Sequence, residues 1–143
     1  MPDITISITT SAPPDPATVT EYGDALPELV KALNNLTGHP EAMDGPWDAY
    51  RLLLNIEEAV SRLPQLLHQV SSRLNGMYAD GRLEMDGDGE FTQPALAALA
   101  VGARVSEAGE LAEPFRAVIA SAAVVTGHMR VREDGSKEGS ADG

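Results

Sequence analysis

The sequence has no cysteine and no long apolar run, and each of these absences excludes a class of protein or site. Without cysteine, the chain cannot use thiol catalysis, thiolate metal ligands or disulfide bonds. Its two most apolar windows, residues 95–103 and 117–125, are far shorter than the about 20 residues that span a bilayer. We therefore expect no membrane-spanning segment. The residues from Met1 to Thr5 also lack the basic and apolar regions of a signal peptide, so a cytoplasmic location is the default expectation.

Positive charge is scarce as well. The chain has 22 acidic and 10 basic residues, a formal net charge of −12, and its largest basic cluster is Arg130 with Arg132. Phosphate backbones would be repelled, so we expect no direct binding to nucleic acid. The acidity either keeps a small helical protein soluble or presents carboxylates to a basic protein partner.

The usual sequence signatures of enzymes and metal sites are missing. The histidines, His39, His68 and His128, are dispersed, and no Glu-x-x-His pair occurs to support a di-iron bundle site. Nucleophile-elbow, phosphate-loop and dinucleotide-binding glycine patterns are absent too. We therefore predict a protein that is not an enzyme and has no cofactor or metal site.

One acidic stretch, residues 84–95, resembles the start of an EF-hand calcium loop. Oxygen ligands stand at loop positions 1, 3 and 5, glycine stands at position 6, and a helix is expected to follow. Position 12, which in that family carries a bidentate glutamate, is Ala95. The missing ligand favours a plain acidic turn, and we predict no calcium binding below the millimolar range.

The dominant pattern is an alternation of apolar residues at steps of four and three through the stretch from Trp47 to Tyr78, which predicts one long amphipathic helix. Leu52, Ala59 and Leu66 widen the apolar stripe, so this helix should contact more than one neighbour. Pro64 predicts a kink near its middle. The predicted seam comprises Ala49, Leu53, Ile56, Val60, Leu63, Leu67, Val70, Leu74 and Met77.

Two further helices are predicted on either side of the central one. The first runs from an N-cap at Asp15 to Gly38, with a kink or break near Gly23 caused by Pro27. The last runs from a cap at Thr92 to about Gly127 and contains Pro114. Small residues in this last helix should let it lie close against the central helix. Its predicted seam comprises Val101, Val105, Ala108, Ala112, Phe115, Ile119 and Ala122, with Gly102 and Gly109 beside it.

The segments outside the helices are short. Residues 3–9 alternate in the manner of a β-strand, which needs a partner in residues 82–85, residues 129–132 or a second chain. Without such a partner, residues 1–14 would form a flexible arm. Residues 131–143 are polar and glycine-rich, which predicts a disordered tail.

Trp47, Tyr50 and Leu54 form the candidate binding patch, on the side of the central helix opposite its predicted seam. Either the first helix or the N-terminal segment covers this patch, or it is a protein interface, because tryptophan and tyrosine commonly anchor interfaces. We keep these three residues as the predicted protein-binding site, through which two copies of the chain are expected to associate.

Together these patterns predict an all-α fold of three kinked amphipathic helices, with a single helical domain over residues 15–130. The central and last helices form an antiparallel hairpin, and the first packs across them. The predicted function is non-enzymatic protein–protein interaction and assembly, as a homodimer. The alternative is an acidic inhibitor or antitoxin-like protein that occupies a basic site on a nuclease or DNA-binding protein.

Overall fold

The computed structural model describes residue 5 and residues 7–133, and that part of the chain contains α-helices, one short 3-10 helix and no β-strand. The all-α prediction is therefore confirmed. Helices α2 and α3 have 34 residues each, so each is about 50 Å long at 1.5 Å per residue. The elements in chain order are α1 (Pro16–Thr37), η1 (Pro40–Ala42), α2 (Pro46–Ala79) and α3 (Pro94–Gly127).

Each long helix begins with a proline, whose fixed φ suits the first helical position and whose missing N–H would have no partner there. At α1 the predicted cap is present, because the Asp15 carboxylate accepts the Thr18 N–H at 2.8 Å. This hydrogen bond holds the pKa of Asp15 below its usual value. The cap predicted at Thr92 is wrong by one residue, since α3 is preceded by Gln93 without a side-chain cap bond.

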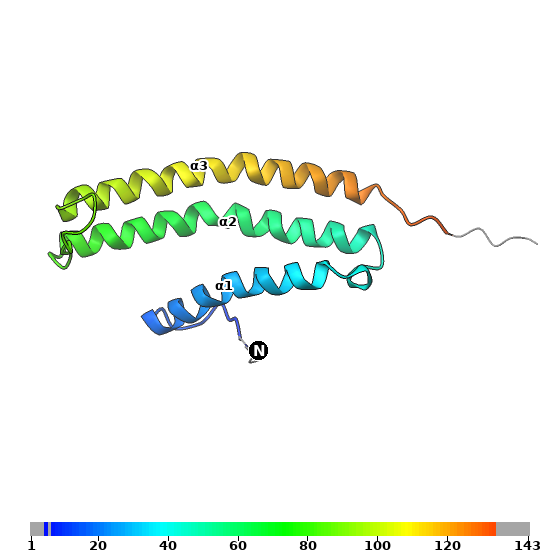
Figure 1. Ribbon diagram of the computed structural model, residues 1–143, viewed down its shortest axis with the longest axis horizontal. Helices are drawn as coiled ribbons and strands as arrows, with labels where there is room; N and C mark the ends of the chain where they lie inside the picture. The colour runs from blue at the N-terminus through cyan, green and yellow to red at the C-terminus, as the bar shows by residue number, and fades with distance from the viewer. Residues whose placement is uncertain (1–4, 6, 134–143) are drawn as a thin grey trace, which may run out of the picture. The chain divides into compact units, whose positions relative to one another are not determined.

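The prolines inside the helices do not interrupt them. Helix α1 is continuous through Pro27, so the predicted break near Gly23 does not occur. Helices α2 and α3 are likewise continuous through Pro64 and Pro114, and both follow a shallow arc in Figure 1. Tertiary contacts along a long helix can absorb one missing hydrogen bond as a gentle bend.

The chain divides into two compact units, one up to Asp44 and one from Gly45 onward. The first contains α1 and η1. The second is a hairpin in which α2 and α3 lie side by side in antiparallel directions along their whole length (Figure 1). The antiparallel hairpin is thus as predicted, whereas the single domain and the packing of the first helix across the hairpin stay predictions.

The N-terminal segment is attached to α1 through Tyr22. The Tyr22 hydroxyl accepts the Thr9 N–H at 3.1 Å and donates to the Ser7 carbonyl at 3.2 Å. Of the strand predicted over residues 3–9, residues 5 and 7–9 are not a strand, and residues 3, 4 and 6 lie outside the described residues. No neighbouring strand in the described chain offers a ladder, so a side-chain hydroxyl takes these backbone groups instead.

A loop over residues 80–93 joins the two hairpin helices. Gly81 and Gly87 have positive φ values of 70° and 84°, which a residue with a side chain rarely adopts. The glycines of these two Asp-Gly pairs therefore allow the chain to turn within the loop. After α3, a methyl group of Val131 lies 3.1 Å from where a Cβ on Gly45 would stand, so this segment runs beside the start of α2. Residues 131–133 of the predicted tail have no regular structure, and residues 134–143 lie outside the described residues.

The hairpin seam is the row of buried and half-buried residues along which α2 and α3 meet, and it alternates at steps of three and four on both helices. On α2 it comprises Tyr50, Leu53, Glu57, Val60, Pro64, Leu67, Ser71 and Leu74. On α3 it comprises Ala95, Ala98, Gly102, Val105, Gly109, Ala112, Arg116, Ile119, Ala123 and Thr126.

Two glycines of α3 lie in this seam, and of the two the helices approach more tightly at Gly102. A Cβ on Gly102 would lie 3.3 Å from the Ser71 hydroxyl, and a Cβ on Gly109 would lie 3.5 Å from the Pro64 Cβ. Bare backbone on α3 therefore faces side chains of α2 at successive heptads.

The predicted seam is half right on each helix. Leu53, Val60, Leu67 and Leu74 on α2 are shared with the observed seam, as are Val105, Ala112 and Ile119 on α3. The remaining predicted residues lie one position earlier in the chain, and Leu63, Val70 and Phe115 are 37%, 47% and 56% exposed. Their places are taken by Pro64, Ser71 and Arg116, because the glycines of α3 permit closer packing than the larger residues beside them.

Candidate protein-interaction site

The predicted patch of Trp47, Tyr50 and Leu54 lies at the open end of the hairpin, where α2 begins and α3 ends. The Trp47 and Tyr50 rings pack at 5.3 Å between centroids with a tilt of 34°. Trp47 is 64% exposed and Leu54 is 37% exposed, while Tyr50 is half-buried. The three side chains are therefore neighbours, with the tryptophan the most accessible.

Tyr50 belongs to the hairpin seam as well as to the patch. A Cβ on Gly127 would lie 3.3 Å from the Tyr50 ring, so this ring packs against the bare backbone at the end of α3. The sequence pattern had placed Tyr50 opposite the seam, and the shift of the seam by one residue explains the difference. The end of α3 covers one side of the patch.

A shallow groove of about 410 Å³ runs between α2 and α3 at this end and is mainly apolar. We call it the Trp47 groove. The side chains from α3 that form its far wall are small, which leaves room beside the indole. It is lined by Trp47, Tyr50, Leu54, Glu57, Ala120, Ala123, Val124, Gly127 and His128.

Glu57, one of the residues that line the groove, also belongs to an ion-pair network around Arg116. Its guanidinium donates to Glu57 on α2 at 2.7 Å and to Glu113 on α3 at 2.7 and 3.0 Å. The Arg116 and Glu57 side chains are 28% and 24% exposed, whereas Glu113 is 69% exposed. Hydrogen bonding to Arg116 lowers the pKa of Glu113, and both carboxylates raise the already high pKa of Arg116. The network joins the two helices.

A second candidate surface is the broad apolar face on one side of the hairpin. On α2 it presents Leu63, Leu66 and Val70, which are 37%, 50% and 47% exposed. On α3 the exposed fractions are higher, between 56% and 69%, for Leu111, Phe115, Val118 and Val125. We call these side chains the apolar face.

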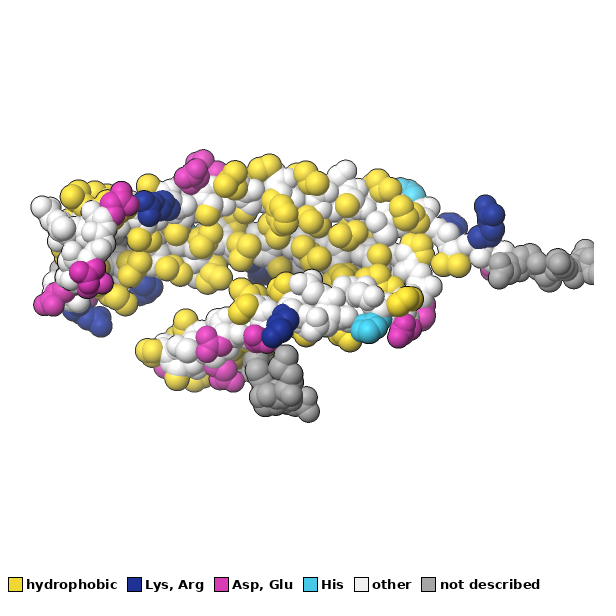
Figure 2. Space-filling model, in the orientation of Figure 1, with side chains coloured by type: hydrophobic (Ala, Val, Ile, Leu, Met, Phe, Trp, Pro, Cys, Tyr) yellow, Lys and Arg dark blue, Asp and Glu magenta, His cyan; other side chains and the backbone are white. Residues whose placement is uncertain are grey.

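Helix geometry puts both halves of the apolar face on the same side. Leu63 precedes the seam residue Pro64, and Phe115 precedes the seam residue Arg116, so each is rotated from the seam by about 100° in the same sense. Because the two helices run in opposite directions, equal rotations turn both stripes towards one side of the hairpin. Figure 2 shows hydrophobic side chains covering the visible side of both helices, with charged groups gathered near the loop end.

The Trp47 groove lies on the other side. Leu54 follows the seam residue Leu53, and Val124 follows the seam residue Ala123, so these residues are rotated from the seam in the opposite sense. The hairpin thus carries two distinct apolar surfaces, of which the sequence pattern singled out only the smaller.

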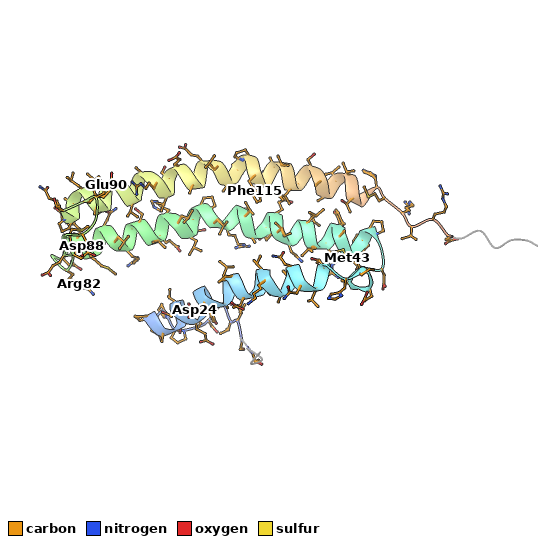
Figure 3. All side chains as sticks on the ribbon, viewed as in Figure 1. Asp24, Met43, Arg82, Asp88, Glu90 and Phe115 are labelled. Carbon is orange, nitrogen blue, oxygen red and sulfur yellow. The ribbon has the colours of Figure 1, made fainter. Side chains whose placement is uncertain are left out.

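The loop that resembles an EF-hand forms a local acidic turn. The Asp86 carboxylate accepts the Asp88 N–H at 3.1 Å, and Glu90 lies 3.6 Å from Arg104 on α3. Figure 3 labels Asp88 and Glu90 at this end of the hairpin. Within the described residues, no group of three or more His, Asp or Glu side chains is placed to hold a metal ion.

Sequence reasoning missed Arg116 and the apolar face for the same reason. The pattern of apolar residues alone predicts Phe115 as a contact residue between the helices and does not include Arg116. The signal that could have located the seam was the row of glycine, alanine and a lone arginine at heptad spacing on α3, facing Glu57, Pro64 and Ser71 on α2.

Comparison with known proteins gives no relative. No family model, no curated protein and no solved structure matches this chain. In the described part of the chain, no helix is both long enough and apolar enough to cross a bilayer.

Proposed function

We propose that this protein is a non-enzymatic interaction protein that assembles through helical faces and works as a homodimer. The observation that carries the proposal is the apolar face, a set of large hydrophobic side chains between 37% and 69% exposed on one side of the α2–α3 hairpin. Contiguous apolar patches of several hundred Å² are uncommon on monomeric proteins and mark interaction sites.

The thin interior of the hairpin supports the same conclusion. Among the described residues, the buried apolar side chains are Val60, Ala98 and Ala123, two of them alanines. A pair of helices buries one stripe on each, and these helices carry two stripes each. Covering the second stripe would stabilise the hairpin, because removal of apolar surface from water is the main driving force of association.

Trp47, Tyr50 and Leu54 remain the predicted protein-binding residues of the Trp47 groove. An exposed indole beside small side chains has the shape of an anchor position in a protein interface. We expect Trp47→Glu to weaken binding at this groove while leaving the helical content of the protein unchanged, because the side chain is 64% exposed and the charge stays in water. Circular dichroism checks the fold, and loss of helix would instead show that Trp47 is needed inside the unit.

Light scattering on the intact chain tests the homodimer. We expect the mass of two chains at micromolar concentration, and a dimer that high salt leaves intact or strengthens, because salt does not weaken apolar contacts and screens the repulsion between two chains of net charge −12. A monomer at all concentrations would contradict the proposal. Capture of a basic protein that weakens steeply with salt would favour the acidic inhibitor instead.

A further inference from the structure

We propose that the apolar face is the surface on which a second copy of this chain binds, so that two α2–α3 hairpins pack face to face as a four-helix bundle. This inference rests on the proposed homodimer and names its interface. It places the Trp47 groove on the outside of the dimer.

The pattern of the apolar face is that of a bundle helix with one partner missing. In a four-helix bundle each helix contacts two neighbours, so it needs two adjacent stripes at steps of three and four. The hairpin seam is one such stripe. The second stripe on α3 keeps the same heptad repeat as the seam and comprises Val101, Arg104, Ala108, Leu111, Phe115, Val118, Ala122 and Val125.

A second hairpin is the occupant whose shape fits this face. The exposed stripes run along two parallel helix rows, so a single added helix would cover one row and leave the other in water. The large residues Leu111, Phe115 and Val118 lie between Ala108 and Ala122, whose small side chains leave gaps that large residues of the other copy can enter. A two-fold dimer needs a surface that complements itself in this way.

The exposed area is also in the range that a dimer needs. The seven large side chains of the apolar face are each about half exposed and present on the order of 600 Å² per chain, against about 800 Å² per partner in a standard interface. Half-buried Leu52 and Ile56 continue the face along α2 and add to this area.

Charge favours this side for contact between copies. With a net charge of −12, two chains repel each other through most of their surfaces. The stripe on α3 carries no charged residue after Arg104, whose guanidinium lies 3.6 Å from Glu90 near the loop end and over the Phe91 ring. On the α3 half of the apolar face, from Ala108 to Val125, two copies can therefore approach without bringing like charges together.

A matched pair of substitutions on α3 tests the interface. Phe115→Glu puts a charge in the apolar face, whereas Leu99→Glu puts the same charge on the opposite side of the same helix, where Leu99 is 70% exposed. We expect Phe115→Glu to raise the dimer dissociation constant at least about tenfold, because a charge is costly in a dry interface. Leu99→Glu should leave it within about twofold. Sedimentation equilibrium measures both, and circular dichroism confirms that both variants remain helical.

A protection experiment does not depend on a disruptive substitution. The chain has no cysteine, so Val118→Cys and Leu99→Cys each introduce a single thiol. We expect a maleimide to label Val118→Cys at least about tenfold more slowly at concentrations where the dimer forms than in dilute solution. Labelling of Leu99→Cys should not change with concentration.

The outcomes separate the interface from the homodimer itself. A dimer that survives Phe115→Glu, and whose Val118→Cys thiol stays reactive, overturns the interface and leaves the homodimer standing. Dissociation by Trp47→Glu alone would transfer the interface to the Trp47 groove. Protection of Val118→Cys that is the same at every concentration would mean coverage within one chain or by a different partner, which also overturns the inference. A native protein that is monomeric throughout ends both proposals.

Discussion

Arg116 forms ion pairs with carboxylates on both helices of the hairpin. It connects Glu57 on α2 with Glu113 on α3, and both side chains of the Glu57–Arg116 pair are half-buried. Pairs that are shielded from solvent are sensitive to the loss of one partner, because the other charge is left without compensation. Exposed pairs such as Arg62 with Glu58 contribute little.

We expect Arg116→Met to lower the melting temperature by several degrees, because Glu57 then stays half-buried without its cation. Glu113→Gln should change it little, since the Glu57–Arg116 pair remains. Thermal unfolding followed by circular dichroism compares the two variants with the native chain. An equal change in melting temperature for both substitutions would mean that the Glu57–Arg116 pair contributes no more to stability than the Glu113–Arg116 pair.

The same network predicts a pH dependence. Arg116 lowers the pKa of Glu113 in the folded state, so the stabilisation from this carboxylate is complete above its ordinary pKa of 4.5 and is lost as the pH falls through the lower folded value. The small difference between Glu113→Gln and the native chain should therefore disappear in acid. A difference that grows in acid would contradict this assignment.

At the scale of helices, sequence periodicity located the three α-helices, missed the short 3-10 helix η1 and rotated the seam. The step pattern of three and four is satisfied by two adjacent stripes on both α2 and α3, because each helix carries apolar residues on both. The choice between the stripes depends on how closely the backbones approach, and that is set by Gly102 and Gly109 together with the side chains opposite them. A pattern search that weighs hydrophobicity alone cannot make this choice. The same rotation explains why Trp47 and Leu54 were correctly placed off the seam while Tyr50 was not.

Neighbouring positions on α3 distinguish the two seams directly. We expect Gly109→Leu to force the helices apart and to destabilise the hairpin by about 1–3 kcal/mol, since a Cβ already meets Pro64 at 3.5 Å. Ala108→Leu adds a similar side chain to the apolar face, and in dilute solution, where the chain is a monomer, it should cost less than about 0.5 kcal/mol. Urea unfolding of both variants gives the comparison. The reverse order would restore the seam that the apolar pattern predicts.

At the scale of the whole molecule, the free energy of unfolding and the free energy of dimer formation are coupled. A hairpin whose buried apolar side chains are Val60, Ala98 and Ala123 in the described part has a small interior of its own. The seven large side chains of the apolar face are between 37% and 69% exposed. The stability of the hairpin should therefore depend on how much of the protein is dimeric.

We expect the melting temperature to rise with protein concentration, because the folded dimer is favoured by mass action while the unfolded chains are separate. Phe115→Glu should remove this dependence. Scanning calorimetry over a hundredfold range of concentration measures it. A melting temperature that is constant over this range would show that the hairpin reaches its full stability alone.

The small residues on the α3 side of the hairpin seam affect how easily α3 could slide along α2. Glycine and alanine occupy most of the α3 seam at equal heptad intervals, and a shift of α3 by one heptad, about 10 Å, would bring similar small residues against α2. The connecting loop of residues 80–93 is long enough to follow part of such a shift. Arg116 breaks this near-repeat, since only one alignment sets its guanidinium beside Glu57. We therefore expect the Arg116–Glu57 ion pair to fix the position of α3 along the axis of α2. Without this pair, α3 would occupy several positions along α2 that have similar energies.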